Sequence, residues 1–318
     1  MRGGESAMIN LSELKARAVE GAYRSSNSGG LGRIFVSDEG IRAGWSALMF
    51  AAIFLILYIA ATGALRQFLS LNPQGPIPLR LALIGESTQL LIVFLATLAM
   101  ARIEDRKLLS YGFTDEHRVI RLVSGVVWGF FCLSVLIGAL WRAGWLVFDG
   151  KLLTGLTAWK FSLAWGLAFL LVGVVEESLL RGYLQYTLSR GIGFWWAALL
   201  LSVVFLLGHT GNGGESTLGL LEVGVAGFYF CISLWFTKSL WWAIGFHAGW
   251  DWAQSFFYGT ADTGLLMSNH LLVTHPSGNP LWSGGTTGPE GSLLILPLVT
   301  MMSTAMWLWW GVRKRGAQ

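Results

Sequence analysis

The feature that most constrains this chain is a series of apolar segments, each about long enough to cross a lipid bilayer as a helix. A helix needs roughly 20 apolar residues to span about 30 Å of hydrocarbon. Of the 318 residues, 54% are hydrophobic and only 13% are charged, which is more apolar than a soluble domain requires. We therefore predict an all-α, polytopic membrane helical bundle of about eight transmembrane helices. The predicted spans are residues 45–65, 81–101, 119–141, 161–180, 194–207, 218–236, 240–257 and 292–312.

Two of these spans have unusual lengths. The segment at 194–207 is short unless its helix continues through Gly208 and His209. The helix at 161–180 can continue to about Ser189, because no proline interrupts it, and it is then longer than a bilayer requires.

The polar stretches divide the chain into regions. A Gly- and Pro-rich outer loop at 258–291 is expected to be irregular. The predicted regions are a polar cytoplasmic tail over 1–43, N-terminal transmembrane helices over 44–157, and a transmembrane core over 158–318 that carries the candidate site and this loop.

The positions of Lys and Arg predict how the chain is oriented. Positively charged loops tend to remain cytoplasmic, and an inner N-terminus places most of the 22 Lys and Arg residues on inner segments. An odd number of spans would put the basic N-terminal tail and the terminal RKRGAQ on opposite sides. We therefore predict that both termini lie inside.

Several other classes of function are disfavoured. The net charge is +4, but the basic residues are dispersed rather than grouped with aromatic residues, so no nucleic-acid partner is expected. Cys132 and Cys231 lie in apolar runs without CxxC spacing, which argues against a thiolate metal site or a disulfide framework. The N-terminal sequence lacks the apolar region of a secretory signal peptide. The expected environment is the lipid bilayer.

Charged and histidine side chains within the spans are the candidates for function. Such groups are costly at bilayer depth, so they usually face the bundle interior and serve a purpose. The candidates are Glu86, Glu176, Glu177, Arg181, His209, Glu222, His247 and Asp251.

The stretch VVEESLLRG holds two adjacent glutamates with different expected roles. Glu177 and Arg181 are four residues apart, on one face of a helix, and can neutralise each other. Glu176 lies about 100° around the helix and needs another partner. A purely structural alternative is that all three form a buried ion cluster that fixes helix packing.

Two further motifs carry histidines. In HAGWD, Asp251 can accept a hydrogen bond from one ring nitrogen of His247 and fix the tautomer that the other presents. Taken alone, that pair fits an ordinary core histidine, and His209 in FLLGH fits an interfacial loop. Glu176 lies 15 residues before Gly191 and His209 lies 18 after it, which places both at roughly 22 to 27 Å from that turn.

His247 and Asp251 follow Ser239 by 8 and 12 residues, or roughly 12 to 18 Å, so their match in depth is looser. Together these depths predict that one carboxylate, two histidines and a second carboxylate converge within the bilayer. A glutamate there can take a proton from water, one imidazole can share that water, and the other can stabilise a developing oxyanion. Such a set could hydrolyse an amide. Glu176, His209 and His247 could instead hold a zinc ion whose bound water attacks. The sequence leaves both open.

These residues resemble the CPBP family of CAAX-processing and bacteriocin-processing intramembrane proteases, also called the Abi family. Its ordered motifs are EExxxR, FxxxH and HxxxN or HxxxD on three helices. The resemblance covers about residues 161–258, and the loop ending GPEGS also looks like bacterial members. The motifs read Glu176-Glu177-Ser-Leu-Leu-Arg181, Phe205-Leu-Leu-Gly-His209 and His247-Ala-Gly-Trp-Asp251.

The resemblance implies a glutamate-dependent intramembrane peptidase that requires no cofactor, in which Glu176 is the general base and His209 helps to hold the water. His247 and Asp251 match positions assigned to oxyanion stabilisation. Asp251 stands where the best-studied eukaryotic-type and archaeal members have Asn, and an ionised Asp cannot donate a hydrogen bond. It is either protonated or acts through His247, which we favour, and the aspartate also strengthens the zinc alternative. The expected supporting residues are Glu177, Arg181 and Phe205.

Two other functions stay open at this point. One is a non-catalytic membrane scaffold, or an immunity or regulatory partner for a bacteriocin. The other is a proton-coupled carrier that uses Glu86, Glu176 and Glu222 as a relay. For the protease we expect a peptide or membrane-protein substrate and a location in the bacterial inner membrane.

Overall fold

The fold is known from a computed structural model, which describes residues 32–37, 40–68 and 75–311. Most of the predicted polar tail, 1–43, and the C-terminal residues 312–318 lie outside these ranges. The prediction that both termini lie inside therefore remains a prediction.

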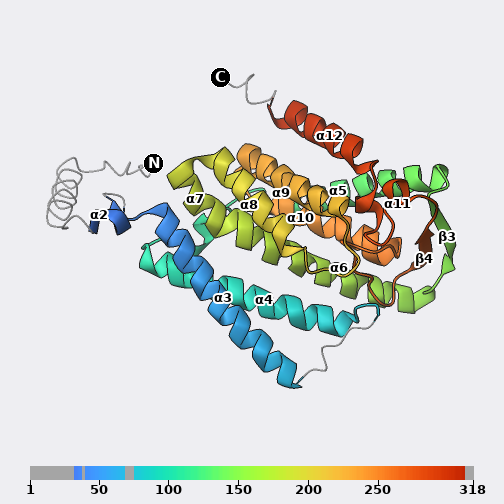
Figure 1. Cartoon of the computed structure of the whole chain (residues 1–318), viewed down its shortest axis with the longest axis horizontal. Coiled ribbons are helices and arrows are strands. Elements are labelled where there is room, and N and C mark those ends of the chain that lie inside the picture. Colours follow the sequence, from blue (N-terminus) through green and yellow to red (C-terminus); the bar gives the residue numbers. More distant parts are fainter. Residues whose placement is uncertain (1–31, 38–39, 69–74, 312–318) are drawn as a thin grey trace, which may run out of the picture.

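The described chain is mostly helical, and Figure 1 shows most of the helices packed side by side, with α3 and α4 along one edge. The elements of the N-terminal half are α2 (Gly32–Phe35), β1 (Val36–Ser37), β2 (Gly40–Ile41), α3 (Ala43–Phe68), α4 (Leu79–Ile103), η1 (Leu108–Ser110), α5 (Arg118–Arg142) and β3 (Leu146–Lys151).

The elements of the second half build the candidate site. They are α6 (Gly155–Glu177), η2 (Ser178–Leu184), α7 (Gln185–Ile192), α8 (Phe194–Gly208), α9 (Thr217–Thr237), α10 (Trp241–Asp251), η3 (Trp252–Phe257), β4 (Leu272–Pro276), α11 (Pro280–Ser283), η4 (Pro289–Gly291), α12 (Ile295–Met306) and η5 (Trp307–Gly311).

Several helices have the length and apolar character of membrane spans. In the described part of the chain, five helices meet both criteria. Two shorter apolar helices accompany them, Phe194–Gly208 and Ile295–Trp310. The remaining predicted span, 240–257, corresponds to α10 and η3. The five long spans are Ala43–Gln67, Leu79–Ile103, Arg118–Arg142, Gly155–Ile192 and Thr217–Thr237. The count of eight crossings remains a prediction, since helix length alone does not decide which of the shorter helices cross.

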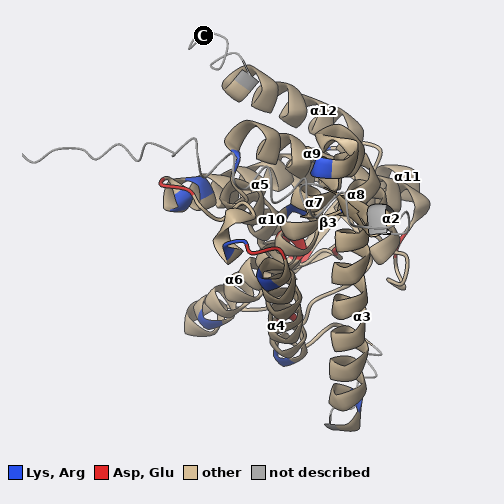
Figure 2. Ribbon diagram, turned by 90° about the vertical axis from the view of Figure 1, so that its left-hand side faces the viewer, with Lys and Arg blue, Asp and Glu red and all other residues tan. Residues whose placement is uncertain are grey.

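The outer surface of the bundle is apolar. On α6, Leu156, Trp159 and Leu163 are 70%, 70% and 71% exposed, and exposed apolar surface on helices of this length is typical of surface that faces lipid. Figure 2 shows long stretches of helix without charge, with Lys and Arg toward the helix ends. The chain is therefore an integral membrane protein.

The longest described helical run extends from Gly155 to Ile192 through α6, η2 and α7, so the segment continues past residue 180 as the lack of proline indicates, but it is kinked at Gly182. Its middle part, η2, is a π-helix, and Gly182 within it leaves helical geometry at φ −80° and ψ −107°. A π segment shifts the positions of side chains around the helix axis and often occurs at functional sites. This one lies directly after Glu176 and Glu177.

Close packing of glycines fixes α10, the helix that carries His247, against α5. A Cβ atom at Gly129 of α5 would overlap the carbonyl oxygen of Phe246. A Cβ atom at Gly245 or Gly249 of α10 would in turn overlap a carbonyl oxygen of α5. Small residues of this kind let two membrane helices approach until their backbones touch.

The helical bundle agrees with the predicted all-α class, and two short antiparallel strand pairs accompany it, β1 with β2 and β3 with β4. One expectation needs correction. The outer loop, 258–291, is not irregular throughout, since it contains β4, α11 and η4. The physical reason is that a segment packed against the bundle must pair its backbone N–H and C=O groups. The partner of β4 lies far away in the sequence, so local composition could not reveal it.

Candidate active site

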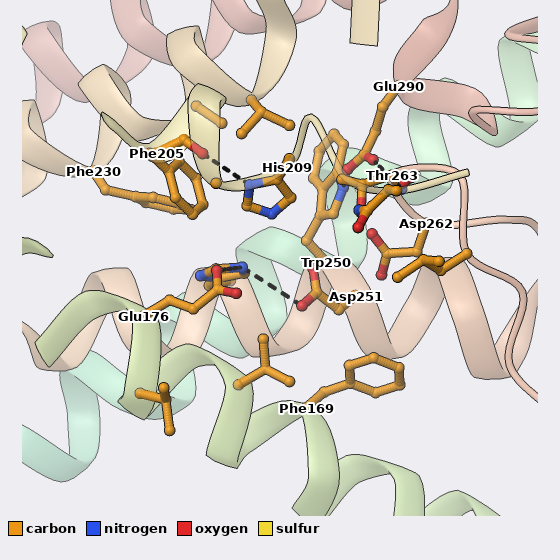
Figure 3. A pocket seen from close by; sticks show the side chains of 18 of the residues that line it. Phe169, Glu176, Phe205, His209, Phe230, Trp250, Asp251, Asp262, Thr263 and Glu290 are labelled. Carbon is orange, nitrogen blue, oxygen red and sulfur yellow. Dashed lines mark hydrogen bonds and ion pairs between the residues drawn. The ribbon is translucent and has the colours of Figure 1, made fainter. Parts of the chain in front are cut away.

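The three motifs meet around one cavity of about 560 Å³. Glu176 comes from the end of α6, His209 caps the C-terminus of α8, and His247 and Asp251 come from α10. All four line the cavity, as does Phe205. Figure 3 shows Glu176, His209 and Asp251 around the same space. The convergence expected from helix depth is therefore present in the structure.

His247 lies at the centre of the polar contacts. Its Nε2 is 3.6 Å from Oε2 of Glu176 and 3.6 Å from Oδ2 of Asp251. Its Nδ1 is 3.2 Å from Oε1 of Glu177. The residue that fixes the ring through a hydrogen bond is thus Glu177, not Asp251 as the spacing suggested. The two adjacent glutamates approach opposite nitrogens of one imidazole, and only Glu177 is within hydrogen-bond distance.

The close approach of α6 and α10 explains this contact. A Cβ atom at Gly173 would lie 2.8 Å from the carbonyl oxygen of Ile244, so the two helices nearly touch one turn before the glutamates. Glu177 then reaches His247, which lies 70 positions away along the sequence. Spacing within a single helix, the only geometric signal available from sequence, could not reveal it.

Glu177 also forms the predicted pair with Arg181. Nη1 of Arg181 is 3.1 Å from Oε1 of Glu177, and both side chains are fully buried. The guanidinium carbon lies 4.5 Å from the ring centre of Phe205 and 5.5 Å from that of Phe230. Cation–π contacts of this kind help to accommodate a charge away from water. One oxygen of Glu177 therefore holds both Arg181 and His247.

His209 is oriented by the backbone of its own helix. Its Nδ1 is 2.9 Å from the carbonyl oxygen of Phe205. Because a carbonyl oxygen only accepts, Nδ1 carries the hydrogen, and Nε2 of the neutral ring is an acceptor. The edge of one ring meets the face of the other, with Phe205 and His209 centroids 4.8 Å apart. His209 thus presents a hydrogen-bond acceptor on the side away from its helix.

The predicted zinc set, Glu176, His209 and His247, does not form a ligand cluster. Within the described ranges, no group of three or more His, Cys, Asp or Glu side chains is placed to hold a metal ion. Nδ1 of each histidine is held, by Phe205 and by Glu177, which leaves Nε2 as the nitrogen that a metal would use. Because no such cluster forms among the described residues, we derive no step through a metal.

Four further carboxylates line the cavity. Glu86 of α4 and Glu222 of α9 were candidates from the sequence because they interrupt apolar spans. Asp262 and Glu290 were not predicted, because a carboxylate in a polar loop gives no signal of burial. Glu290 is only 6% exposed, and its Oε1 accepts a hydrogen bond of 2.7 Å from Nε1 of Trp250.

The fold and the site together define an integral membrane protein with a carboxylate–histidine centre inside its bundle. Residues 158–253 match the family model described as type II CAAX prenyl endopeptidase Rce1-like. The matched segment holds all three motifs, so the predicted resemblance to the CPBP/CAAX protease family is confirmed, and a protease is implied. No curated protein matches the chain significantly.

Proposed function

We propose that the chain is an intramembrane endopeptidase that hydrolyses peptide bonds with a water molecule activated by Glu176. The observation that supports this most is that Glu176 and Asp251 approach the same nitrogen of His247 in a cavity that His209 also lines. The family match covers the helices that carry these residues. Neither a serine nor a cysteine is needed, because water is the nucleophile.

Glu176 is the general base of this mechanism. Its Oε2 is buried and has no hydrogen-bond partner among the described residues, so it can accept a proton from water. Nε2 of His209 can accept the second hydrogen of the same water. Two acceptors would orient the lone pairs of the water oxygen toward the carbonyl carbon of a peptide bond.

The reaction then needs two proton transfers and one oxyanion contact. The water oxygen bonds to the carbonyl carbon while its proton passes to Glu176. The carbonyl oxygen becomes negative and accepts a hydrogen bond from N–H at Nε2 of His247. The amide C–N bond breaks as Glu176 returns the proton to the leaving nitrogen, which yields a carboxylic acid and an amine.

Asp251 acts through His247 in this scheme. At 3.6 Å from Nε2 it favours the protonated ring without holding the N–H in a full hydrogen bond. The N–H stays available to the substrate. Glu177 and Arg181 orient the ring from its other side, and Phe205 supports both Arg181 and His209.

The proposed substrate is a peptide or membrane protein that reaches the cavity from the bilayer. A CAAX protein needs a host that attaches prenyl groups. We place this chain in the bacterial inner membrane, with both termini inside, so peptides or membrane proteins without a prenyl group are the expected targets.

Replacement of the base tests the proposal. Glu176→Gln keeps the shape of the side chain and should reduce cleavage by at least about 10²-fold, the usual contribution of a general base. The readout is quantitative mass spectrometry of membrane peptides from cells that express the parent or the variant. The matched control is Glu116→Gln, an exposed residue before α5, which should cleave like the parent. A folded Glu176→Gln chain that cleaves at the parental rate would rule out the proposed base.

The same variants separate the alternatives. Protection against a bacteriocin that survives both Glu176→Gln and His209→Ala indicates a scaffold or immunity partner. Dissipation of a pH gradient in vesicles indicates a carrier. Metal analysis of the purified parent tests the zinc alternative, which requires about one bound zinc per chain that is lost on Glu176→Gln.

A further inference from the structure

The cavity has an acidic end that the proposed mechanism does not use. It is formed by Glu222 of α9, Asp262 of the outer loop and Glu290 of η4, all of which line the cavity. Figure 3 shows Asp262 and Glu290 beyond Trp250 and Asp251, on the side away from Glu176. A chain that passes Glu176 can therefore extend toward these carboxylates.

Two of the three carboxylates are held in place. Glu290 accepts hydrogen bonds from Nε1 of Trp250 at 2.7 Å and from the backbone N–H of Thr263 at 3.2 Å. Asp262 accepts one from the Ser255 hydroxyl at 2.9 Å. Held groups of this kind lose little freedom when a ligand binds.

Glu222 has no such partner. It is 5% exposed and lines the cavity, yet it forms no hydrogen bond or ion pair with any described residue. The charges of Glu290, Glu215 and Asp251 repel it, and that of His247 attracts it. A buried, unpartnered carboxylate is costly, and a cation in the cavity would relieve that cost.

The surroundings fit an organic cation. Among the described residues that line the cavity, none is Lys or Arg, so His247 is the cavity group whose positive charge acts on these acids. The acids do not form a metal-ligand cluster among the described residues, whereas Trp250, whose indole N–H donates to Glu290, supplies an aromatic ring of the kind that attracts ammonium and guanidinium groups.

We propose that Glu222, Asp262 and Glu290 form a binding site for the cationic side chain of a substrate Lys or Arg, which lies a few residues from the peptide bond presented to Glu176. This inference rests on the proposed function, because it takes the ligand to be a substrate peptide. The substrates expected for such a site are peptides that carry a basic residue beside an apolar segment.

Binding to a chain that cannot cleave tests the site without relying on proteolysis. The chain is full-length Glu176→Gln in lipid nanodiscs. The probes are two photo-crosslinkable peptides, Leu-rich and alike except for one central residue, which is lysine in one and Nε-acetyl-lysine in the other. The lysine probe should bind at least about tenfold more tightly, as expected for a charge-assisted hydrogen bond. Adding Glu222→Gln should reduce that preference to within about twofold.

The control is Glu116→Gln, which removes an exposed carboxylate before α5 and should leave the tenfold preference unchanged. Each chain is first shown to be folded by its thermal unfolding. Equal binding of the two probes, or a preference that survives Glu222→Gln, would overturn the site, as would a divalent metal that copurifies with the parent and is lost on Glu222→Gln. The proposed function is tested separately by the cleavage assay, and it fails if the Glu176→Gln chain cleaves at the parental rate.

Discussion

Glu176 and Glu177 are neighbours in sequence and contact opposite nitrogens of the same histidine, but their surroundings differ. Glu177 is fully buried and shares one oxygen between Arg181 and His247. Glu176 has a side chain that is 29% exposed and faces the cavity. Glu176 is therefore placed to act on a substrate, whereas Glu177 is placed to support the ring of His247 and the guanidinium of Arg181.

This difference predicts opposite effects on stability. Glu177→Gln leaves the buried Arg181 without its counter-ion and should lower the free energy of unfolding by about 3–5 kcal/mol. Glu176→Gln should change it far less. Thermal unfolding in one detergent compares the two variants. The double variant Glu177→Gln/Arg181→Met should recover part of the loss, and a single Glu177→Gln as stable as the parent would contradict the pairing.

Asp251 allows a second prediction at the same scale. Asp251→Ala removes the group that acts on Nε2 of His247 and should cost about 10²-fold in cleavage rate, the usual cost of one oxyanion contact. Asp251→Asn keeps the shape but removes the charge that favours the protonated ring, so it should lose about as much activity as Asp251→Ala. Rates on one substrate peptide decide this, and an Asp251→Asn chain that cleaves like the parent would contradict a role of the charge.

At the scale of elements, the contact between α5 and α10 positions His247. Gly129→Ala would push a methyl group into a backbone carbonyl of α10, which cannot rotate away, and should cost about 1–3 kcal/mol. Gly138 is a matched control on the same helix, because a Cβ atom there would meet no other atom within 4 Å. Gly138→Ala should be neutral or slightly stabilising. Unfolding in detergent measures both, and equal stability of the two variants would refute the role of the contact.

The sequence predicted those features that depend on local spacing. Apolar length located the helical segments, and the four-residue interval located the pair of Glu177 and Arg181. Contacts between distant segments were not predictable, such as Glu177 with His247 or β3 with β4. The burial of Glu290 was also missed, because loop composition does not show which loops fold back onto a bundle.

At the scale of the whole molecule, the outer loop covers one end of the cavity and is tied to the bundle by Glu290. Trp250→Phe keeps the aromatic packing and removes the hydrogen bond to that carboxylate. A hydrogen bond to a charged group contributes about 1.5–3 kcal/mol, so amides of residues 258–291 should exchange hydrogen roughly tenfold faster or more. Exchange measured by mass spectrometry tests this, with α3 as an internal reference that should not change.

The pairing of β3 with β4 also bears on biosynthesis. β3 precedes every helix that carries a motif, and β4 follows all of them. Chains fold from the N-terminus as they emerge from the ribosome. During translation β3 therefore has no partner strand until all residues of the carboxylate–histidine centre have been synthesised. The loop can therefore be fastened to β3 only after the chemical groups are in place, and a chain truncated before β4 would lack both this pairing and Glu290.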